Sequence, residues 1–226
     1  MNSKSILVSA AHADDEALGC GGTLAVHAAR GDRVHALFLT DGVGARGAGE
    51  DTAARQRREA ASAALACLGV HDATFLALPD NKMDGLPLLE IVRQVEPVIA
   101  ASCPDVVYTH HFGDLNVDHR LAHQAAMTAL RPQPGAVAPS ILCFEIPSST
   151  EWQTSSALWA FVPNWFQDIG SVFDRKLAAL ECYAEEMRPW PHSRSIDAVT
   201  HLARWRGASV GVEAAEAFML ARHIAR

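Results

Sequence analysis

Residues 6–16 read Ile6-Leu7-Val8-Ser9-Ala10-Ala11-His12-Ala13-Asp14-Asp15-Glu16. A strand-like apolar run ends there in one imidazole and three carboxylates, and a glycine-rich segment follows at residues 19–22. Burying so much charge is costly unless the side chains are paired or bind a metal. His12 and Asp15 offer a nitrogen and an oxygen ligand three residues apart, which suits one divalent ion, and Asp14 between them is available for proton transfer. The alternative is a solvated acidic turn in which Asp14 or Asp15 caps a helix.

The composition limits the classes of function. A chain of 226 residues with 49% hydrophobic residues fits one large domain, residues 1–226, with an ample core. A net charge of -7 argues against nucleic acid or an anionic membrane surface as a partner. The five cysteines are scattered and form no CxxC pair, which is typical of a reducing compartment. No signal peptide and no membrane-spanning apolar run is apparent, so we expect a cytoplasmic protein.

The pattern along the chain predicts alternating strands and helices. We expect strands near residues 5–10, 34–40, 73–78, 106–109 and 141–146. We expect helices near residues 20–30, 52–68, 88–102, 121–130 and 172–187, and another that ends near 206. Residues 147–164 are predicted to form a long loop, and residues 212–219 fit either a strand or a helix. This alternation predicts a Rossmann-like, doubly wound α/β fold with a mostly parallel sheet and helices on both faces.

A second polar cluster follows the fourth predicted strand and reads His110-His111-Phe112-Gly113-Asp114-Leu115-Asn116-Val117-Asp118-His119-Arg120. In a doubly wound sheet the first and fourth strands are neighbours, and ligands bind at their carboxyl ends. The topology therefore brings this cluster close to His12 and Asp15. A third imidazole would complete a site of two histidines and one aspartate, which is typical of catalytic zinc. His119 is the preferred ligand because it opens a helix, whereas His110 and His111 are candidates for hydrogen bonding at the rim.

The chain resembles the PIG-L/LmbE-like family of zinc-dependent de-N-acetylases, and within it a bacterial branch of amino-sugar deacetylases. The resemblance covers most of the chain and is carried by residues 11–16, 18–23, 40–42 and 116–120, by Glu59, and by residues 68–69, 79–81, 148–152 and 215–218. It implies that His12, Asp15 and His119 bind Zn²⁺ or another divalent metal, and that Asp14 is the general base.

Two positions depart from the family pattern. Ala13 replaces the usual proline, which the turn is expected to tolerate. Asn116 replaces a histidine that in the family helps to stabilise the oxyanion. An asparagine amide is still a hydrogen-bond donor, so we predict that Asn116 has this catalytic role, with His111 and His192 as alternatives.

The resemblance predicts a hydrolase of non-peptide amide bonds that removes an N-acetyl group from an amino sugar of the N-acetylglucosamine type. The predicted substrates include the free sugar and sugars linked to a nucleotide or lipid, and the predicted partners include a second copy of the chain in a homo-oligomer. The loops after the first and fourth strands would build the metal site, and the C-terminal part would complete the substrate pocket. Further substrate contacts are predicted at Asp41, Arg58, Asp80, His111, Glu145 and His192.

Two other interpretations remain open. One is an amidase that acts on another small amide, such as a thiol-sugar conjugate. The other is a nucleotide-binding Rossmann-like protein, either an oxidoreductase or non-catalytic, which residues 19–22 and Asp41 suggest. This second interpretation is weaker, because the charged residues 12–16 stand where a dinucleotide motif needs a tight glycine turn.

Overall fold

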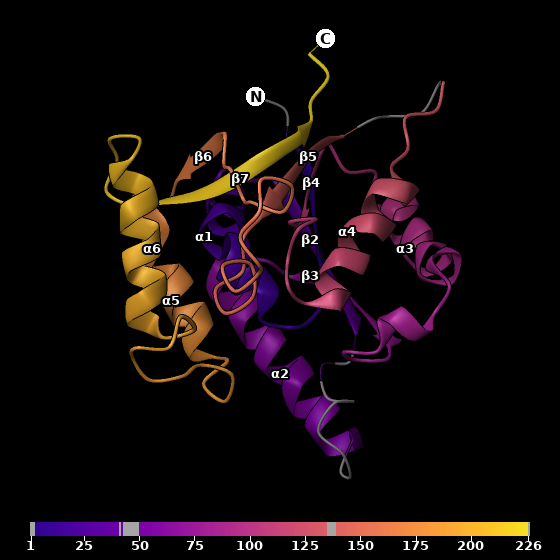
Figure 1. Cartoon of the computed structure of the whole chain (residues 1–226), viewed down its shortest axis with the longest axis horizontal. Coiled ribbons are helices and arrows are strands. Elements are labelled where there is room, and N and C mark those ends of the chain that lie inside the picture. Colours follow the sequence, from indigo (N-terminus) through magenta and orange to yellow (C-terminus); the bar gives the residue numbers. More distant parts are fainter. Residues whose placement is uncertain (1–2, 41, 43–49, 135–138, 226) are drawn as a thin grey trace.

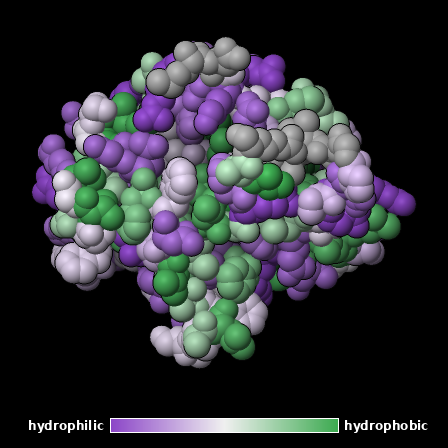
Figure 2. Space-filling view, turned by 90° about the horizontal axis from the view of Figure 1, so that it is seen from above, coloured by the Kyte–Doolittle hydropathy of each residue, from purple (hydrophilic) through white to green (hydrophobic). Residues whose placement is uncertain are grey.

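The computed structural model describes residues 3–40, 42, 50–134 and 139–225. Asp41, one of the predicted substrate contacts, lies outside the described residues. Within the described part of the chain, no helix has the length and apolarity needed to cross a membrane. On the face seen from above in Figure 2, hydrophobic residues are interspersed with hydrophilic ones.

The centre of the molecule is a seven-stranded sheet with the order β3-β2-β1-β4-β5-β7-β6. Five strands are parallel to one another: β1 (Ser5–Ala10), β2 (Arg33–Thr40), β3 (Asp72–Leu78), β4 (Val106–His110) and β5 (Ser140–Phe144). At the other end of the sheet, β7 (Ala215–Arg222) runs antiparallel to both of its neighbours, β5 and β6 (Trp165–Asp168). The predicted doubly wound, mostly parallel sheet is confirmed, and β1 and β4 are adjacent as expected.

Helices cover both faces of this sheet (Figure 1). They are α1 (Asp15–Ala29), α2 (Glu50–Leu68), α3 (Leu88–Ser102), α4 (Val117–Ala129), α5 (Phe173–Glu181) and α6 (Ile196–Ala208). Successive side chains of a strand point to opposite faces. Ile6 and Val8 of β1 therefore pack with apolar residues of α1, α2, α5 and α6, whereas Leu7 packs with those of α3 and α4.

Several predicted boundaries were wrong because tertiary contacts override local signals. Helix α1 begins at Asp15, not near residue 20, and continues through a kink at Cys20. The Glu216 carboxylate of β7 accepts the backbone N–H groups of Gly22 and Thr23 at 2.9 and 2.7 Å, just after this kink. The helix expected at residues 172–187 ends at Glu181. The ambiguous segment 212–219 contributes to a strand, β7, and β6 was not anticipated.

The three glycines of residues 19–22 lie inside α1, and two of them, Gly19 and Gly22, allow close packing. A Cβ atom on Gly22 would lie 2.8 Å from side-chain atoms of Ile169, and one on Gly19 would overlap the Phe144 ring. The missing side chains let α1 approach the sheet and the segment after β6. This packing accounts for the glycines without a bound nucleotide.

We predict that Gly22→Ala lowers the free energy of unfolding by about 1–3 kcal/mol, because Ile169 and the backbone that carries it must move. In thermal denaturation this corresponds to a fall in Tm of several degrees. Gly85→Ala is the matched control, since a Cβ there has no atom of the described structure within 4 Å. Equal melting temperatures of Gly22→Ala and the wild type would contradict this account of the packing.

Candidate active site

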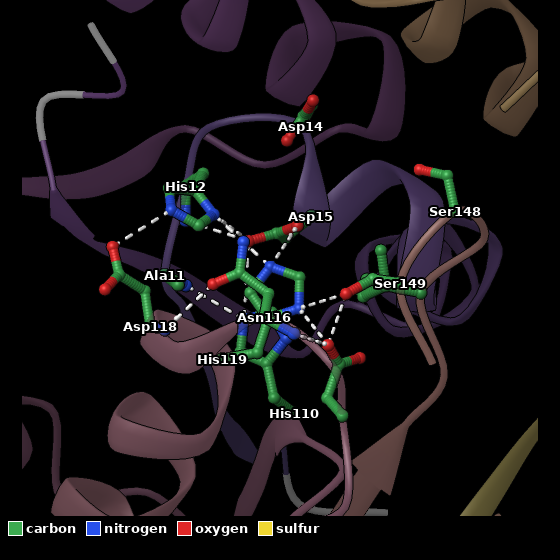
Figure 3. Close-up of polar contacts among 12 residues, drawn as sticks. Ala11, His12, Asp14, Asp15, His110, Asn116, Asp118, His119, Ser148 and Ser149 are labelled. Atoms are coloured by element: carbon green, nitrogen blue, oxygen red, sulfur yellow. Dashed lines mark hydrogen bonds and ion pairs between the residues drawn. The ribbon is translucent and has the colours of Figure 1, made fainter. Parts of the chain in front are cut away.

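The two polar clusters meet where β1 and β4 end. The strands pair in parallel, with Ile6 opposite Val106 and Ser9 opposite Thr109. His12 lies in the turn between β1 and α1, Asp15 is the first residue of α1, and His119 lies in the first turn of α4 after β4. Figure 3 shows the side chains of these three residues converging.

One nitrogen of each imidazole lies close to the Asp15 carboxylate, and the two nitrogens face different oxygens of that carboxylate. His12 Nδ1 is 3.2 Å from Asp15 Oδ2, His119 Nε2 is 3.3 Å from Asp15 Oδ1, and the two imidazole nitrogens are 3.3 Å apart. Two ligands of a tetrahedral zinc ion with bonds of about 2.0 Å lie about 3.3 Å from each other. Asp15 Oδ1 is buried and has no hydrogen-bond partner among the described residues. The residues present therefore fit a divalent ion.

Carboxylates lie beside the second ring nitrogen of each histidine, the nitrogen that does not face Asp15. His119 Nδ1 lies 3.0 Å from Asp114 Oδ1, and His12 Nε2 lies 3.2 Å from Asp80 Oδ1 and 3.3 Å from Asp118 Oδ2. A metal-binding imidazole commonly donates its second N–H to a carboxylate, which fixes the ring and its tautomer. Here that arrangement leaves His12 Nδ1 and His119 Nε2 directed toward Asp15.

Asp114 was missed by the sequence analysis. Its carboxylate is fully buried, and it accepts hydrogen bonds from the Ser149 hydroxyl, from the Thr150 hydroxyl at 2.6 Å and from the Asn116 backbone at 2.9 Å. Burial raises its pKa, but His119 and these donors outweigh burial and hold the pKa at about 2. The acidic residue five positions before His119 was a usable signal, because a buried histidine ligand needs such a partner.

His110 and His111 have other contacts. His110 Nε2 accepts the Ala11 backbone N–H at 2.9 Å, and burial lowers the pKa of this imidazole to about 4. His111 Nε2 lies 2.9 Å from the Trp159 carbonyl oxygen, to which it donates. Both rings are therefore engaged with the backbone, and His119 is the imidazole that faces His12.

Asp14 has an unusual backbone conformation. Its φ of 126° is rare for a residue other than glycine, and its N–H donates to Glu16 Oε2 at 3.0 Å. The Tyr183 hydroxyl donates to Glu16 Oε1 at 2.7 Å and so braces this turn. Strained backbone of this kind is found at functional sites, where the surroundings enforce it. Burial raises the pKa of the Asp14 carboxyl to about 6, although the neighbouring Arg194 guanidinium opposes the rise.

A polar pocket of about 180 Å³ opens in front of these residues. His12, Asp14 and His119 line it, together with two predicted contacts, Asp80 and Asn116. The sequence analysis did not place seven of the lining residues there: Gly42, Arg57, Asn81, Ser148, Ser149, Glu186 and Arg194. Four of these seven come from the C-terminal part of the chain.

Asn116 also caps α4. Its Oδ1 accepts the backbone N–H of Asp118 at 2.8 Å, so the helix begins at Val117 and not near residue 121. Its Nδ2 donates to Asn81 Oδ1 at 3.3 Å. The amide thus has a structural contact on each side in addition to its place at the pocket.

The predicted contact Arg58 is corrected by the structure. Arg58 is exposed and its guanidinium carbon lies 5.7 Å from the centre of the Phe75 ring. Consecutive residues of a helix point in different directions, and on α2 it is Arg57 that reaches the pocket. There it donates to the Glu186 carboxylate and, at 3.4 Å, to the Ala13 carbonyl oxygen.

Three more predicted contacts lie away from the pocket lining. Glu145 forms a bidentate ion pair with Arg206, whose Nε donates to Oε1 at 2.8 Å and whose Nη2 donates to Oε2 at 2.7 Å. His111 is held by the Trp159 backbone, as described above. His192 packs against the edge of Trp152, with ring centres 5.5 Å apart, and its Nδ1 accepts the Arg194 backbone N–H. In these contacts both oxygens of Glu145 are engaged, whereas each histidine uses one ring nitrogen.

Two known proteins are similar to this chain in sequence. The chain is 35% identical to the "Uncharacterized deacetylase YaiS" of Escherichia coli over 79% of this chain and 89% of the relative. It is 32% identical to the "4-oxalmesaconate hydratase" of Pseudomonas putida over 84% of this chain and 76% of the relative.

Two solved structures have the same fold. GalB, the 4-carboxy-2-hydroxymuconate hydratase of Pseudomonas putida, superposes with a TM-score of 0.81 at 25% identity and covers 100% of this chain and 98% of its own. The N,N'-diacetylchitobiose deacetylase of Pyrococcus horikoshii superposes with a TM-score of 0.78 at 20% identity, over 97% of this chain and 84% of its own. The family model "PIG-L: GlcNAc-PI de-N-acetylase" matches residues 7–130, more than half of the chain, and includes both polar clusters. The chain therefore belongs to the PIG-L family of deacetylases.

Proposed function

We propose that this protein is a metal-dependent hydrolase that removes an N-acetyl group from an amino sugar or its conjugate. The observation that carries the proposal is the convergence of His12 Nδ1, His119 Nε2 and the buried Asp15 carboxylate at a polar pocket that Asp14 also lines. The family supports the class of reaction, and the diacetylchitobiose deacetylase supports the class of substrate.

The three residues would hold Zn²⁺ or another divalent ion through two neutral imidazole nitrogens and one carboxylate oxygen. When bound, such an ion polarises the amide carbonyl and makes a water molecule more acidic. Asp80, Asp114 and Asp118 would keep the two imidazoles in the tautomer that this role requires.

Asp14 would act as the general base. Its Oδ2 accepts a hydrogen bond from Arg194 Nη1 at 2.9 Å, and its Oδ1 has no hydrogen-bond partner among the described residues. Oδ1 would take a proton from the attacking water and pass it to the amine nitrogen as the C–N bond breaks. A carboxyl whose pKa is near 6 is suited to both steps around neutral pH.

Asn116 would stabilise the oxyanion. Its Nδ2 carries two hydrogens, of which one is directed to Asn81, so the second can be donated to the carbonyl oxygen as negative charge develops there. An amide does not titrate in the physiological range. In this role Asn116 would bind the oxyanion but would not supply a proton.

We expect the purified protein to hold about one divalent ion per chain, and we expect His12→Ala, Asp15→Ala and His119→Ala each to lose most of it. Metal content measured by elemental analysis checks this. His201→Ala is the control, because that imidazole is exposed and lies against Trp190. The assignment fails if His119→Ala keeps its metal while His110→Ala loses it.

Asp14→Asn should keep its metal and turn over about a hundredfold more slowly or worse, because the amide cannot accept the proton. Steady-state kinetics at equal metal occupancy provide the test. A kcat near the wild-type value would remove Asp14 from the mechanism.

Asn116→Asp separates the two roles of this residue, because a carboxylate still caps α4 but no longer donates. We predict an unchanged metal content and a slightly lower melting temperature, because the bond to Asn81 is lost, with kcat lower by roughly 10²–10³. If kcat is unchanged while His111→Ala or His192→Ala lowers it strongly, the oxyanion donor is one of those histidines.

Hydration of an unsaturated carboxylate is a second candidate reaction. It is favoured by the 32% identical relative, a hydratase, and by two guanidiniums at the pocket, Arg57 and Arg194, a group that binds carboxylates well. Activation of a water by the same residues would serve this reaction too.

Parallel assays distinguish the candidates. One measures free-amine release from N-acetylated sugars, sugar nucleotides and acylated thiol-sugar conjugates. The other follows loss of ultraviolet absorbance from conjugated unsaturated carboxylates, with Asp14→Asn as the control in both. Amine release supports the proposal, and hydration without amine release overturns it.

A further inference from the structure

Arg194 lies 180 residues along the chain from Asp14, in the segment between α5 and α6, yet it reaches the candidate base. Its Nη1 donates to Asp14 Oδ2 at 2.9 Å, and its Nε donates to the Ser148 hydroxyl at 2.9 Å. The side chains of Asp14 and Arg194 are only 6% and 19% exposed. Arg194 and Ser148 both lie outside residues 7–130, which the family model matches.

We propose that Arg194 is a positioning residue that, with Ser148, fixes the orientation of the Asp14 carboxylate. The inference deepens the proposed function, since it rests on Asp14 as the general base. It assigns to the C-terminal part of this chain a direct part in aligning the catalytic group.

Hydrogen bonds to neighbouring residues hold the backbone of Arg194 in place. The Arg194 backbone N–H donates to His192 Nδ1 at 3.0 Å, and its carbonyl oxygen accepts the Arg188 N–H at 3.2 Å. The next residue, Ser195, caps α6 by accepting the Ala198 N–H at 3.0 Å. The arginine is thus anchored through its backbone, and its side chain extends from a fixed base.

The backbone of Ser148, the other partner of the Arg194 guanidinium, is also held by a hydrogen bond. It has a φ of 70°, and its N–H donates to Glu151 Oε1 at 2.7 Å. Ser148 and Ser149 are adjacent in the chain but point in different directions (Figure 3). Ser149 hydrogen-bonds to Asp114 and lies 3.4 Å from His119 Nδ1, whereas Ser148 accepts from Arg194. One loop therefore supports a candidate metal ligand and the candidate base.

Asp14 needs this support because its backbone contacts do not fix its carboxylate. The bond to Glu16 holds the Asp14 main chain, but the side chain can still rotate. A charge-assisted hydrogen bond at Oδ2 selects one orientation and leaves Oδ1 for the proton transfer. A small misplacement of a catalytic group can cost about a hundredfold in rate.

Arg194 also lines the pocket, so a direct contact with substrate is the competing explanation. The two roles differ in their coupling to Asp14. A residue that acts through Asp14 adds no further loss once Asp14 is disabled, whereas a substrate contact acts independently and raises KM.

The experiment is a double-mutant cycle of Arg194→Met and Asp14→Asn in the metal-loaded protein. We expect Arg194→Met to keep its metal, to change KM less than about twofold, and to lower kcat by about tenfold to a hundredfold. The double variant should be no slower than Asp14→Asn alone. Arg194→Lys should recover part of the loss, because an ammonium can still donate to Asp14.

Arg188→Met is the matched control, since this arginine is exposed and its guanidinium donates to the Glu185 and Met187 carbonyl oxygens, whereas its bond to Arg194 is made by the backbone and is retained. It should leave kcat unchanged. Losses that multiply in the double variant, or an effect confined to KM, would overturn the proposal.

A crystal structure of Arg194→Met gives a second answer that needs no turnover. We expect the Asp14 carboxylate to leave its wild-type orientation while His12, Asp15 and His119 stay in place. An unchanged Asp14 orientation would overturn the inference. If the wild type releases no amine from any substrate, the proposed function fails, and this structural result still decides the positioning role.

Discussion

The parallel pairing of β1 with β4 is the constraint on which the site depends. It places the ends of two segments about a hundred residues apart in the chain at one edge of the sheet, so that His12 and Asp15 meet His119. Burying the ionised Asp15 carboxylate costs free energy, and electrostatic interactions with neighbouring histidines offset this cost. Burial would raise its pKa, but His119 and His110 lower it well below its usual value. The carboxylate stays ionised in the interior, as a metal ligand must.

The other buried charges near the site must be compensated as well, and this accounts for the residues around it. Buried charge is tolerated where hydrogen bonds and opposite charges compensate it. Asp14 is paired with Arg194, Asp114 with His119, and Glu16 accepts from Tyr183. The residues that compensate these charges come from α4, from the loop after β5 and from the segments beside α5. The C-terminal part of the chain therefore contributes residues to the candidate site, although the family model matches only residues 7–130.

Periodicity and local chemistry were sufficient to predict the five parallel strands and the adjacency of β1 and β4. Together with the resemblance to the family, they predicted that His12 and Asp15 meet His119. They failed for residues whose contacts depend on the rotation of a helix or on a partner far away in the chain. Two neighbouring arginines of α2 look alike in sequence, and only the rotation of the helix brings Arg57 rather than Arg58 to the pocket. Arg194 carries no local signal, because its partner lies 180 residues away. The capping role of Asn116 was missed because the helix was expected to begin near residue 121 and not at Val117.

The position of the metal tests the central claim most directly. His12 belongs to two groups that could hold an ion, one with Asp15 and His119 and the other with Asp80 and Asp118. Anomalous diffraction at the zinc edge from crystals of the zinc-loaded protein locates the ion without any assay of activity. The account predicts one peak bonded at about 2.0–2.2 Å to His12 Nδ1, His119 Nε2 and Asp15. A single peak between His12 Nε2, Asp80 and Asp118 would contradict it.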